Sequence, residues 1–231
     1  EVIPTLKYED FLKYHEEYYH PSNSYIYIYG DMDVNERLEY LDREYLSDFD
    51  VSDVDIHANI ERQAAFDKPV YETKPYAITE DESLEDNTYL SYNAVIGTSV
   101  DAKLYLAFQI LDYALVMTPG APVKQALLDA GISTDVYSSY ETSLYQPVYS
   151  IVAKNSNSKE QDRFVSVIND TLEKLVKDGI NERTIEAGIN YYEFKYREAD
   201  YGPYPKGLMY YLTMMDSWLY DETKPFIHIE A

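Results

Sequence analysis

The sequence has no cysteine, a single tryptophan and few basic residues. The absence of cysteine excludes disulfides, thiolate metal sites and thiol catalysis, although it does not identify the redox compartment. Neither a Gly-Lys-Ser/Thr phosphate loop nor a Gly-x-Ser-x-Gly nucleophile elbow occurs, so the motifs for those two kinds of chemistry are missing. Only 19 lysine and arginine residues stand against 42 aspartate and glutamate residues, which gives a formal net charge of -23.

This acidity argues against nucleic acid as a partner, because a chain of this charge repels a phosphate backbone. An anionic membrane surface is disfavoured for the same reason, and we expect no apolar run to approach a membrane span. Hydrophobic residues make up 45% of the chain and charged residues 26%, the balance of an ordinary globular core with a solvated surface. We expect a soluble, cytoplasmic protein, although the sequence does not fix its localisation.

Tyrosine is the abundant aromatic residue, with 27 copies against 7 phenylalanines. Tyrosine favours strands and needs only an edge for its hydroxyl, so a half-buried aromatic sheet surface is the simpler interpretation. The alternative is a self-standing, tyrosine-rich module that binds peptides or glycans. The tyrosines are scattered over every expected element, which favours the structural interpretation, and a single tryptophan argues against a dedicated carbohydrate module.

The first part of the chain predicts a helix, a strand and a second helix. Apolar residues at helical spacing predict a helix over residues 6–19, and Pro21 ends it. A strict alternation of tyrosine and isoleucine predicts a strand over residues 24–29, followed by a helix over residues 33–46. The periodicity then fades, and residues 48–86 are expected to form an extended, acidic connector with one or two short strands.

The remainder predicts an α+β fold, with helices packed on one face of a mainly antiparallel sheet. A strand is expected at residues 87–96, a helix at 101–117, a short helix at 123–130, a β-hairpin at 136–143 and 147–154, and three further helices. The first of these three is expected to begin at a capping box made by Ser158 and Gln161. Asn181 is expected to cap the second, and the third to span residues 206–220.

The most suggestive motif for a metal is His15-Glu16-Glu17-Tyr18-Tyr19-His20. Two ligands on one helix face need i,i+4 spacing, whereas these two histidines are five residues apart, about 140° around a helix. His15 shares the apolar stripe, so we expect a packed structural histidine. The other two, His57 and His228, are isolated from possible co-ligands. No residue is therefore assigned a catalytic, cofactor-binding or metal-binding role.

Three stretches resemble the insulinase/pitrilysin family of zinc metallopeptidases, in its presequence-protease-like branch. Residues 8–33, with the turn His20-Pro21-Ser22-Asn23 and the ending Gly30-Asp31, are similar to the segment that closes the family's first domain. Residues 118–127, Thr-Pro-Gly-Ala-Pro-Val-Lys-Gln-Ala-Leu, resemble a helix break in the second domain. Residues 202–220, from Gly-Pro-Tyr-Pro-Lys-Gly-Leu to Asp-Ser-Trp-Leu-Tyr, resemble a loop and helix of that same domain.

The resemblance implies a zinc endopeptidase of four related α+β domains in two halves, which enclose a chamber that degrades unstructured peptides. In such enzymes an inverted His-x-x-Glu-His helix and a later glutamate of the first domain hold the zinc. That motif is absent here and is expected upstream of Glu1. The family's substrate-anchoring arginine and tyrosine are expected downstream of Ala231. No functional residue of the family maps onto this chain, so zinc is expected in the parent protein and not in this part of it.

The resemblance also predicts the domain organisation. Residues 1–50 are expected to close the first, metal-holding domain, residues 51–86 to form a connector, and residues 87–231 to make up most of the second, non-catalytic domain. The chain begins without a methionine and ends within an apolar alternation, so we expect an internal fragment. Its expected partners are the remaining domains of the peptidase and unstructured peptides, basic ones if the acids face the chamber. We further predict that Tyr25–Tyr29 pairs with the second domain's sheet, within one chain or in a strand-exchanged dimer.

Overall fold

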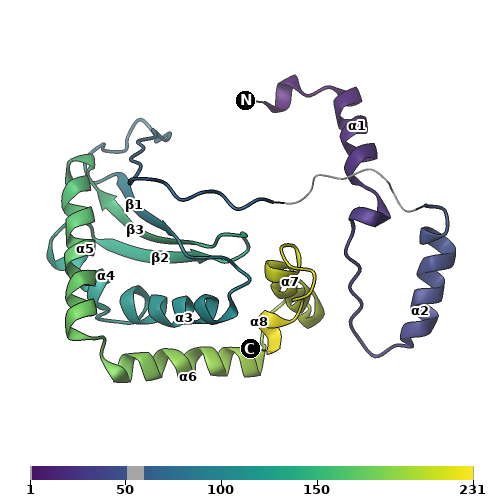
Figure 1. Ribbon diagram of the computed structural model, residues 1–231. Helices are drawn as coiled ribbons and strands as arrows, with labels where there is room; N and C mark the ends of the chain where they lie inside the picture. The colour runs from purple at the N-terminus through teal and green to yellow at the C-terminus, as the bar shows by residue number, and fades with distance from the viewer. Residues whose placement is uncertain (1, 51–59, 231) are drawn as a thin grey trace. The chain divides into compact units, whose positions relative to one another are not determined.

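The computed structural model describes residues 2–50 and 60–230. The chain divides into two compact units, Glu1–Glu61 and Arg62–Ala231, which we call the N-terminal unit and the C-terminal unit (Figure 1). Each is described by itself.

The N-terminal unit is built from two helices. After a 3-10 turn at Ile3–Thr5, helix α1 spans Tyr8–Tyr18 and helix α2 spans Val34–Leu41, continuing in a π-helical turn to Leu46. The side chain of Asp33 accepts a hydrogen bond from the Glu36 amide at 3.1 Å and so caps α2. Both predicted helices are confirmed, but no residue of either is buried.

The strand expected at residues 24–29 is not formed, and that prediction is wrong. Among the described residues the sheet has three strands, none of them from this stretch. Ile26 and Tyr29 are exposed to 47% and 51%. An alternating sequence becomes a strand only when a neighbouring strand accepts its backbone hydrogen bonds, and none of the described strands pairs with this stretch. The predicted pairing of Tyr25–Tyr29 within one chain is therefore wrong as well, while exchange between two chains stays a prediction.

The C-terminal unit contains an antiparallel sheet with the order β1-β3-β2. The strands are β1 (Thr88–Val95), β2 (Asp135–Glu141) and β3 (Val148–Ser156). The hairpin of β2 and β3 is confirmed, and Ser139 lies opposite Ser150 within it. In the described part of the connector, residues 60–86, the short strands that we expected are absent. Residues 51–59 lie outside the described residues.

The helices of this unit pack on one face of the sheet, which confirms the predicted α+β fold. In Figure 1, α3 lies below the sheet and α6 lies below α3, while α5 stands at the end of the strands. Their bounds are α3 (Ala102–Asp112, continued by a π-helical turn to Met117), α4 (Pro122–Asp129), α5 (Gln161–Asp178), α6 (Glu182–Glu198), α7 (Lys206–Trp218) and α8 (Ile227–Glu230). The sequence did not predict α8.

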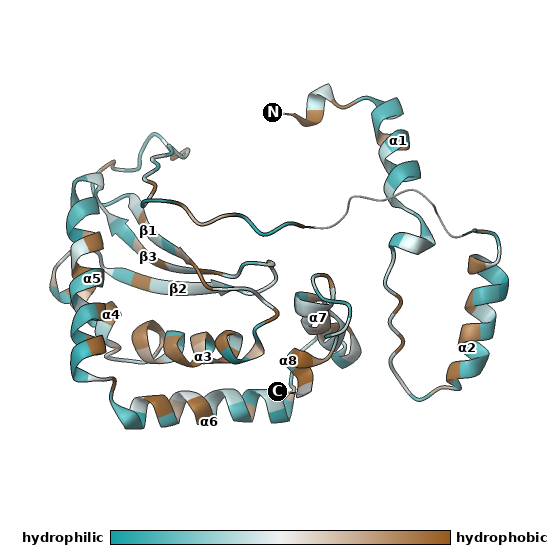
Figure 2. Cartoon of the chain, viewed as in Figure 1, coloured by the Kyte–Doolittle hydropathy of each residue, from teal (hydrophilic) through white to brown (hydrophobic). Residues whose placement is uncertain are grey.

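The core lies between the sheet and these helices. In Figure 2 apolar residues appear as brown segments along the strands and along helices such as α3. Burying one large apolar side chain stabilises a fold by about 1.5–3 kcal/mol, so this cluster dominates the stability of the unit. The buried members are Leu90, Leu115, Val116, Val123, Leu127, Ile132, Val136, Tyr149, Ile151, Ala153, Phe164 and Ile168.

Two predicted helix caps have different outcomes. The side chain of Asn181 accepts a hydrogen bond from the Arg183 amide at 2.9 Å, which confirms this cap. The capping box at Ser158 is wrong, because residues 158–160 form a 3-10 turn and α5 begins at Gln161 without a side-chain cap. The adjacent Asn157 instead hydrogen bonds to Asp86 through both its amide nitrogen and its amide oxygen. That contact joins the end of the connector to the start of α5.

One stretch, Ala102–Asp129, is long and apolar enough to cross a membrane by length and composition alone. The expectation that no run approaches a membrane span is therefore wrong. The stretch is interrupted at Thr118, where the backbone is extended, between the π-helical turn and α4. Its residues Val116 and Val123 are fully buried in the core. The same apolar stripe that covers the sheet thus gives the stretch its hydropathy.

Candidate functional site

The face of the sheet that the helices leave uncovered is a candidate surface of the C-terminal unit. We call it the open face. Side chains alternate along each strand, so the residues next to the buried ones point to this face. It carries Tyr89, Ser91, Asn93 and Val95 from β1, Val148, Ser150, Val152 and Lys154 from β3, and Asp135, Tyr137, Ser139 and Glu141 from β2.

Small polar side chains lie at the centre of the open face, between Val148 and Val152 of β3. The amide oxygen of Asn93 accepts hydrogen bonds from the hydroxyls of Ser91 at 2.9 Å and Ser150 at 2.7 Å. Ser139 lies across from Ser150 on β2. These side chains are held in place by each other and expose no large apolar group. The centre of the face can therefore stay in contact with water at little cost.

One end of the open face is aromatic and basic. The Lys154 ammonium lies 5.3 Å from the ring centre of Tyr137 and 6.0 Å from that of Tyr89, within the range of a cation–π contact. Tyr89 packs edge-on against Tyr76 of the connector. The hydroxyl of Tyr76 in turn donates to Asn87. This end of the face is tied to the connector by aromatic contacts.

A buried carboxyl group lies behind the sheet, at the end of α3. Asp112 is 6% exposed and accepts a hydrogen bond from the Tyr149 hydroxyl at 2.9 Å. Burial raises the pKa of Asp112, and the Ser138 and Tyr149 hydroxyls act against that shift. Burial also raises the pKa of Tyr149, assisted by the Asp112 charge. The pair joins α3 to β3 as a structural contact inside the core.

A second carboxyl group, Asp216 of α7, is partly buried beside α3. Its Oδ2 atom accepts hydrogen bonds from the hydroxyls of Tyr105 at 3.2 Å and Thr142 at 3.4 Å. Burial raises the pKa of Asp216 to about 6, while the two hydroxyls oppose the shift. Sequence reasoning missed both carboxyl groups. The detectable signal for Asp112 was a lone acid directly after the apolar stripe of α3.

The two histidines of the motif at residues 15–20 have different surroundings. His15 is exposed on α1 and stacks on Tyr19 with ring centres 4.5 Å apart. The expectation that His15 is packed is therefore wrong, because no described residue of its unit buries a side chain of α1. The Nδ1 atom of His20 accepts a hydrogen bond from the Ser22 amide at 3.1 Å, and the His20 ring meets Phe49 edge-on at 5.4 Å. His57 lies outside the described residues.

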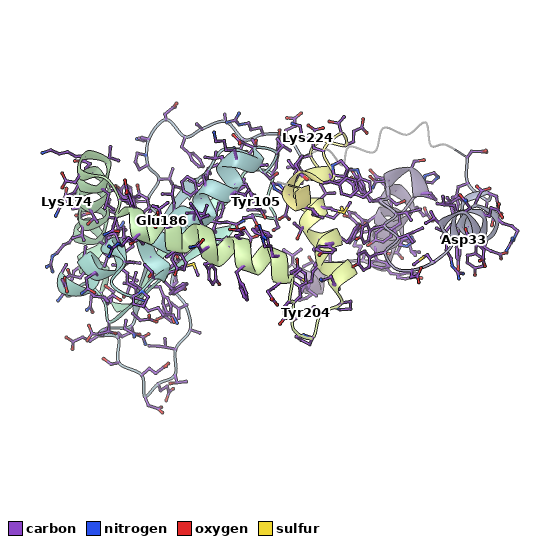
Figure 3. All side chains as sticks on the ribbon, turned by 90° about the horizontal axis from the view of Figure 1, so that it is seen from below. Asp33, Tyr105, Lys174, Glu186, Tyr204 and Lys224 are labelled. Carbon is purple, nitrogen blue, oxygen red and sulfur yellow. The ribbon has the colours of Figure 1, made fainter. Side chains whose placement is uncertain are left out.

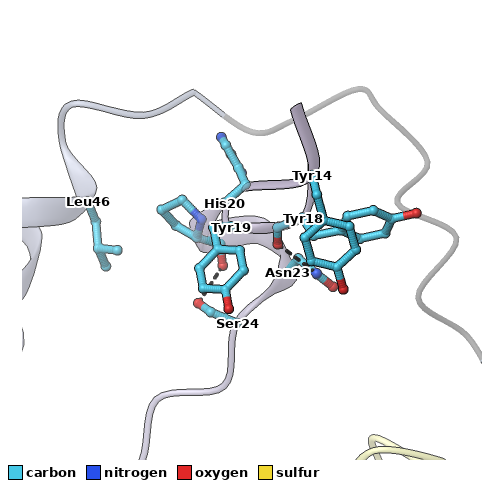
Figure 4. Close-up of a pocket in the computed structure, with 8 residues that line it drawn as sticks. Tyr14, Tyr18, Tyr19, His20, Asn23, Ser24 and Leu46 are labelled. Atoms are coloured by element: carbon cyan, nitrogen blue, oxygen red, sulfur yellow. Dashed lines mark hydrogen bonds between the residues drawn. The ribbon is translucent and has the colours of Figure 1, made fainter. Parts of the chain in front are cut away.

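The N-terminal unit has a shallow hollow, and His20 is one of the residues that line it (Figure 4). Two further contacts shape it: Asn23 donates to the Tyr18 carbonyl at 2.9 Å, and Ser24 donates to the Pro21 carbonyl at 2.7 Å. These bonds fix the turn after α1, so the side chains of His20, Asn23 and Ser24 are engaged with the backbone. Its lining consists of Tyr14, Tyr18, Tyr19, His20, Pro21, Asn23, Ser24 and Leu46.

The described residues of this chain do not fit a zinc site. Protein zinc sites use three or four histidine, cysteine or carboxylate ligands gathered around one point. Within residues 2–50 and 60–230 no group of three such side chains is placed to hold a metal ion. Nδ1 of His20 is used by the Ser22 amide, and His15 stacks on a tyrosine. That no residue of the chain is catalytic remains a prediction.

The described residues thus define an α+β domain with a polar open face, preceded by a unit that buries none of its helical side chains. Comparison with known proteins gives the class a name. The chain belongs to the family of peptidase M16 inactive domains, whose family model matches residues 5–192. This finding confirms the resemblance to insulinase-type and presequence-protease-like peptidases.

The relatives are much longer than this chain. It is 44% identical to Protein HypA of Clostridium perfringens over 99% of its own length and 23% of that protein. It is 34% identical to presequence protease 1, chloroplastic/mitochondrial, of Arabidopsis thaliana, over 95% of its length and 20% of that protein. A solved inactive peptidase domain of a zinc protease from Bordetella parapertussis superposes with a TM-score of 0.47 at 12% identity, covering 62% of this chain and 82% of its own. The chain therefore spans about a fifth of the length of the curated relatives it matches.

Proposed function

We propose that this chain is a non-catalytic wall and scaffold segment of a zinc metalloendopeptidase that degrades unstructured peptides. The observation that carries the proposal is the match of an inactive-domain family model to residues 5–192. The name of the Arabidopsis relative, a presequence protease, supports peptide cleavage as the activity of the parent protein. The parent's zinc is then expected upstream of Glu1, which agrees with the described residues, where no suitable ligand set occurs.

The open face is the part of the segment that best suits a chamber wall. Near its centre Asn93 is held by Ser91 and Ser150, so these polar side chains are already paired with each other. The opposite face of the sheet is occupied by the helix layer, so the open face alone is available to line a space. A wall of this kind encloses peptides without anchoring them.

The N-terminal unit supports the proposed domain organisation. Its helices α1 and α2 bury no residue, although both carry apolar side chains such as Phe11 and Leu38. The apolar side chains on one face of an amphipathic helix normally pack against another surface of the protein. We therefore assign residues 1–50 to the closing part of a preceding, metal-holding domain, residues 51–86 to a connector, and residues 87–231 to most of the second domain.

The test uses the longer protein that includes the residues encoded upstream of Glu1. We expect a His-x-x-Glu-His motif there, one equivalent of bound zinc, and cleavage of an unfolded peptide. Replacing the motif's glutamate with glutamine should abolish cleavage and keep the zinc. As a matched control within this chain, His15→Gln should leave both unchanged. An upstream region with no such motif, or activity lost in the His15→Gln variant, would reject the proposal.

Basic peptides are the substrates that the charge of the chain favours. The N-terminal unit alone carries 16 acidic against 4 basic residues. If these acids face the chamber, electrostatic steering raises the rate for basic peptides, and salt weakens the effect. The competing explanation is that the acids lie on the outer surface and serve solubility. Equal cleavage rates for basic and acidic peptides, at low and high salt alike, would reject steering.

The tyrosine-rich binding module stays the alternative function, because tyrosines such as Tyr71, Tyr89 and Tyr137 are exposed. Other tyrosines have structural roles. Tyr105 and Tyr149 are buried in the core, and Tyr113 stacks on Tyr191 between helices, with ring centres 5.2 Å apart.

We retain the cytoplasm as the proposed location of the parent, to be checked by cell fractionation. A strand-exchanged dimer is checked by sedimentation velocity, where a single monomeric species would exclude it.

A further inference from the structure

The last helix of the described chain is held in place by a buried histidine. His228 of α8 is 5% exposed, and its ring stacks on Tyr105 of α3 with centres 4.0 Å apart and planes inclined by 27°. Tyr105 lies where α3 meets α7 and α8 (Figure 3). The hydroxyl of Ser217 donates to the Lys224 carbonyl at 2.8 Å and fixes the turn that leads into α8.

The imidazole of His228 is buried without a polar partner. Among the described residues, neither of its nitrogens has a hydrogen-bond partner, and the buried Ser99 hydroxyl is also unpaired. Burial lowers the pKa of His228 from its usual 6.5. The Ser99 main chain acts against that shift but does not reach hydrogen-bond geometry.

The charged groups of the neighbouring elements do not neutralise a protonated His228. Asp216 of α7 is engaged by the Tyr105 and Thr142 hydroxyls, with Glu141 of β2 adding to its negative surroundings. Lys224 in the turn before α8 pairs with Asp221 at 3.1 Å. The Tyr105 ring would attract an imidazolium by a cation–π contact. That gain is smaller than the cost of burying a charge without a hydrogen-bond partner.

We propose that α8 is a pH-sensitive element, which docks on α3 and α7 only while the His228 imidazole is neutral. Since docking holds the imidazole in its neutral form, the undocked state takes up the proton more readily. Docking is therefore fully stable above pH 6.5 and weakens as the pH falls below it. Release of α8 would uncover Tyr105 and the edge of α7. Protonation of Asp216 has the opposite effect on stability, because it removes a buried charge as the pH falls. The experiment must therefore separate the contribution of Asp216 from that of His228.

Hydrogen exchange of the peptide covering α8 in the 231-residue chain tests the proposal between pH 5 and 8. We expect its protection, corrected for intrinsic rates, to fall by up to tenfold for each pH unit below 6.5. His228→Phe keeps the stacking ring and removes the titration, so its protection should not change with pH. His15→Phe, at an exposed histidine, should behave like the unchanged chain, and Asp216→Asn should keep the loss of protection.

The same loss of protection in the His228→Phe variant and the unchanged chain would overturn the proposal. If His228→Phe does not fold, the NMR titration of the His228 imidazole in the unchanged chain decides. A midpoint clearly below 6.5 supports the proposal, and a midpoint at or above 6.5 contradicts it.

Discussion

The N-terminal and C-terminal units both contain amphipathic helices, but among the described residues only the C-terminal unit buries apolar side chains of its helices. Phe11 on α1 is 65% exposed, whereas Phe164 on α5 is 1% exposed. Every buried apolar residue of the described chain lies in the C-terminal unit. The difference is the sheet, which gives the second set of helices a surface to pack on. An amphipathic helix therefore buries its apolar face only where another element packs against it. The apolar faces of α1 and α2 need such a surface from outside the N-terminal unit.

The largest expected effect on the free energy of unfolding separates two phenylalanines, the buried Phe164 and the exposed Phe11. Phe164→Ala opens a cavity in the core and should lower the free energy of unfolding by about 3–5 kcal/mol. Phe11→Ala removes an exposed ring and should change it by less than about 0.5 kcal/mol. Urea unfolding of the two variants, followed by circular dichroism, measures both. A comparable loss in Phe11→Ala would show that α1 is packed and would break the comparison.

The next effect concerns a pair of tyrosine hydroxyls. Tyr149→Phe removes the hydroxyl that donates to the buried Asp112 and should cost about 1–3 kcal/mol, since the carboxyl group loses this partner. Tyr14→Phe alters an exposed residue of α1 and should be neutral within about 0.5 kcal/mol. The comparison uses thermal unfolding at pH 7. A neutral Tyr149→Phe would mean that water replaces the lost hydroxyl.

A third effect is a pH dependence confined to the C-terminal unit. The pKa of Asp216 is raised to about 6 in the folded state from 3.8, so the folded chain binds this proton more tightly than the unfolded chain. Its contribution is present at low pH and is lost as the pH rises through about 6. Asp216→Asn should therefore gain about 1–2 kcal/mol relative to the unchanged chain between pH 4.5 and 7.5. Asp10→Asn, on the exposed surface of α1, provides the background, and parallel pH profiles for all three proteins would contradict the assignment.

The smallest effect compares two helix caps of similar geometry. Asn181→Ala should lower global stability by about 1 kcal/mol, because α6 is packed in the folded unit. Asp33→Ala should reduce helicity near α2 and leave the global transition unchanged, because α2 buries nothing. Chemical unfolding and residue-level NMR shifts distinguish a local effect from a global one. A lowered global midpoint in Asp33→Ala would show that the two units unfold together.

The sequence predicted elements better than it predicted what they contact. The helices and the hairpin follow from local periodicity, and Asn181 is a cap that needs only its own helix. The strand at residues 24–29 and the packed His15 failed because both depend on a surface outside their unit. The burial of Asp216 and His228 could not be predicted, because it results from contacts between residues far apart in the chain, and the sequence signal at Asp112 did not identify its partner Tyr149. The family followed from a resemblance, and no arrangement of side chains could have supplied it.

Zinc binding by the 231-residue chain is the most direct test of the account. The account predicts that calorimetric titration with submicromolar zinc shows no stoichiometric binding. His15 and His20 lie five residues apart, and the described residues contain no group of three histidine, cysteine or carboxylate side chains that could hold the metal. One equivalent of tightly bound zinc, lost in His15→Ala, would contradict the claim that this chain is a non-catalytic segment.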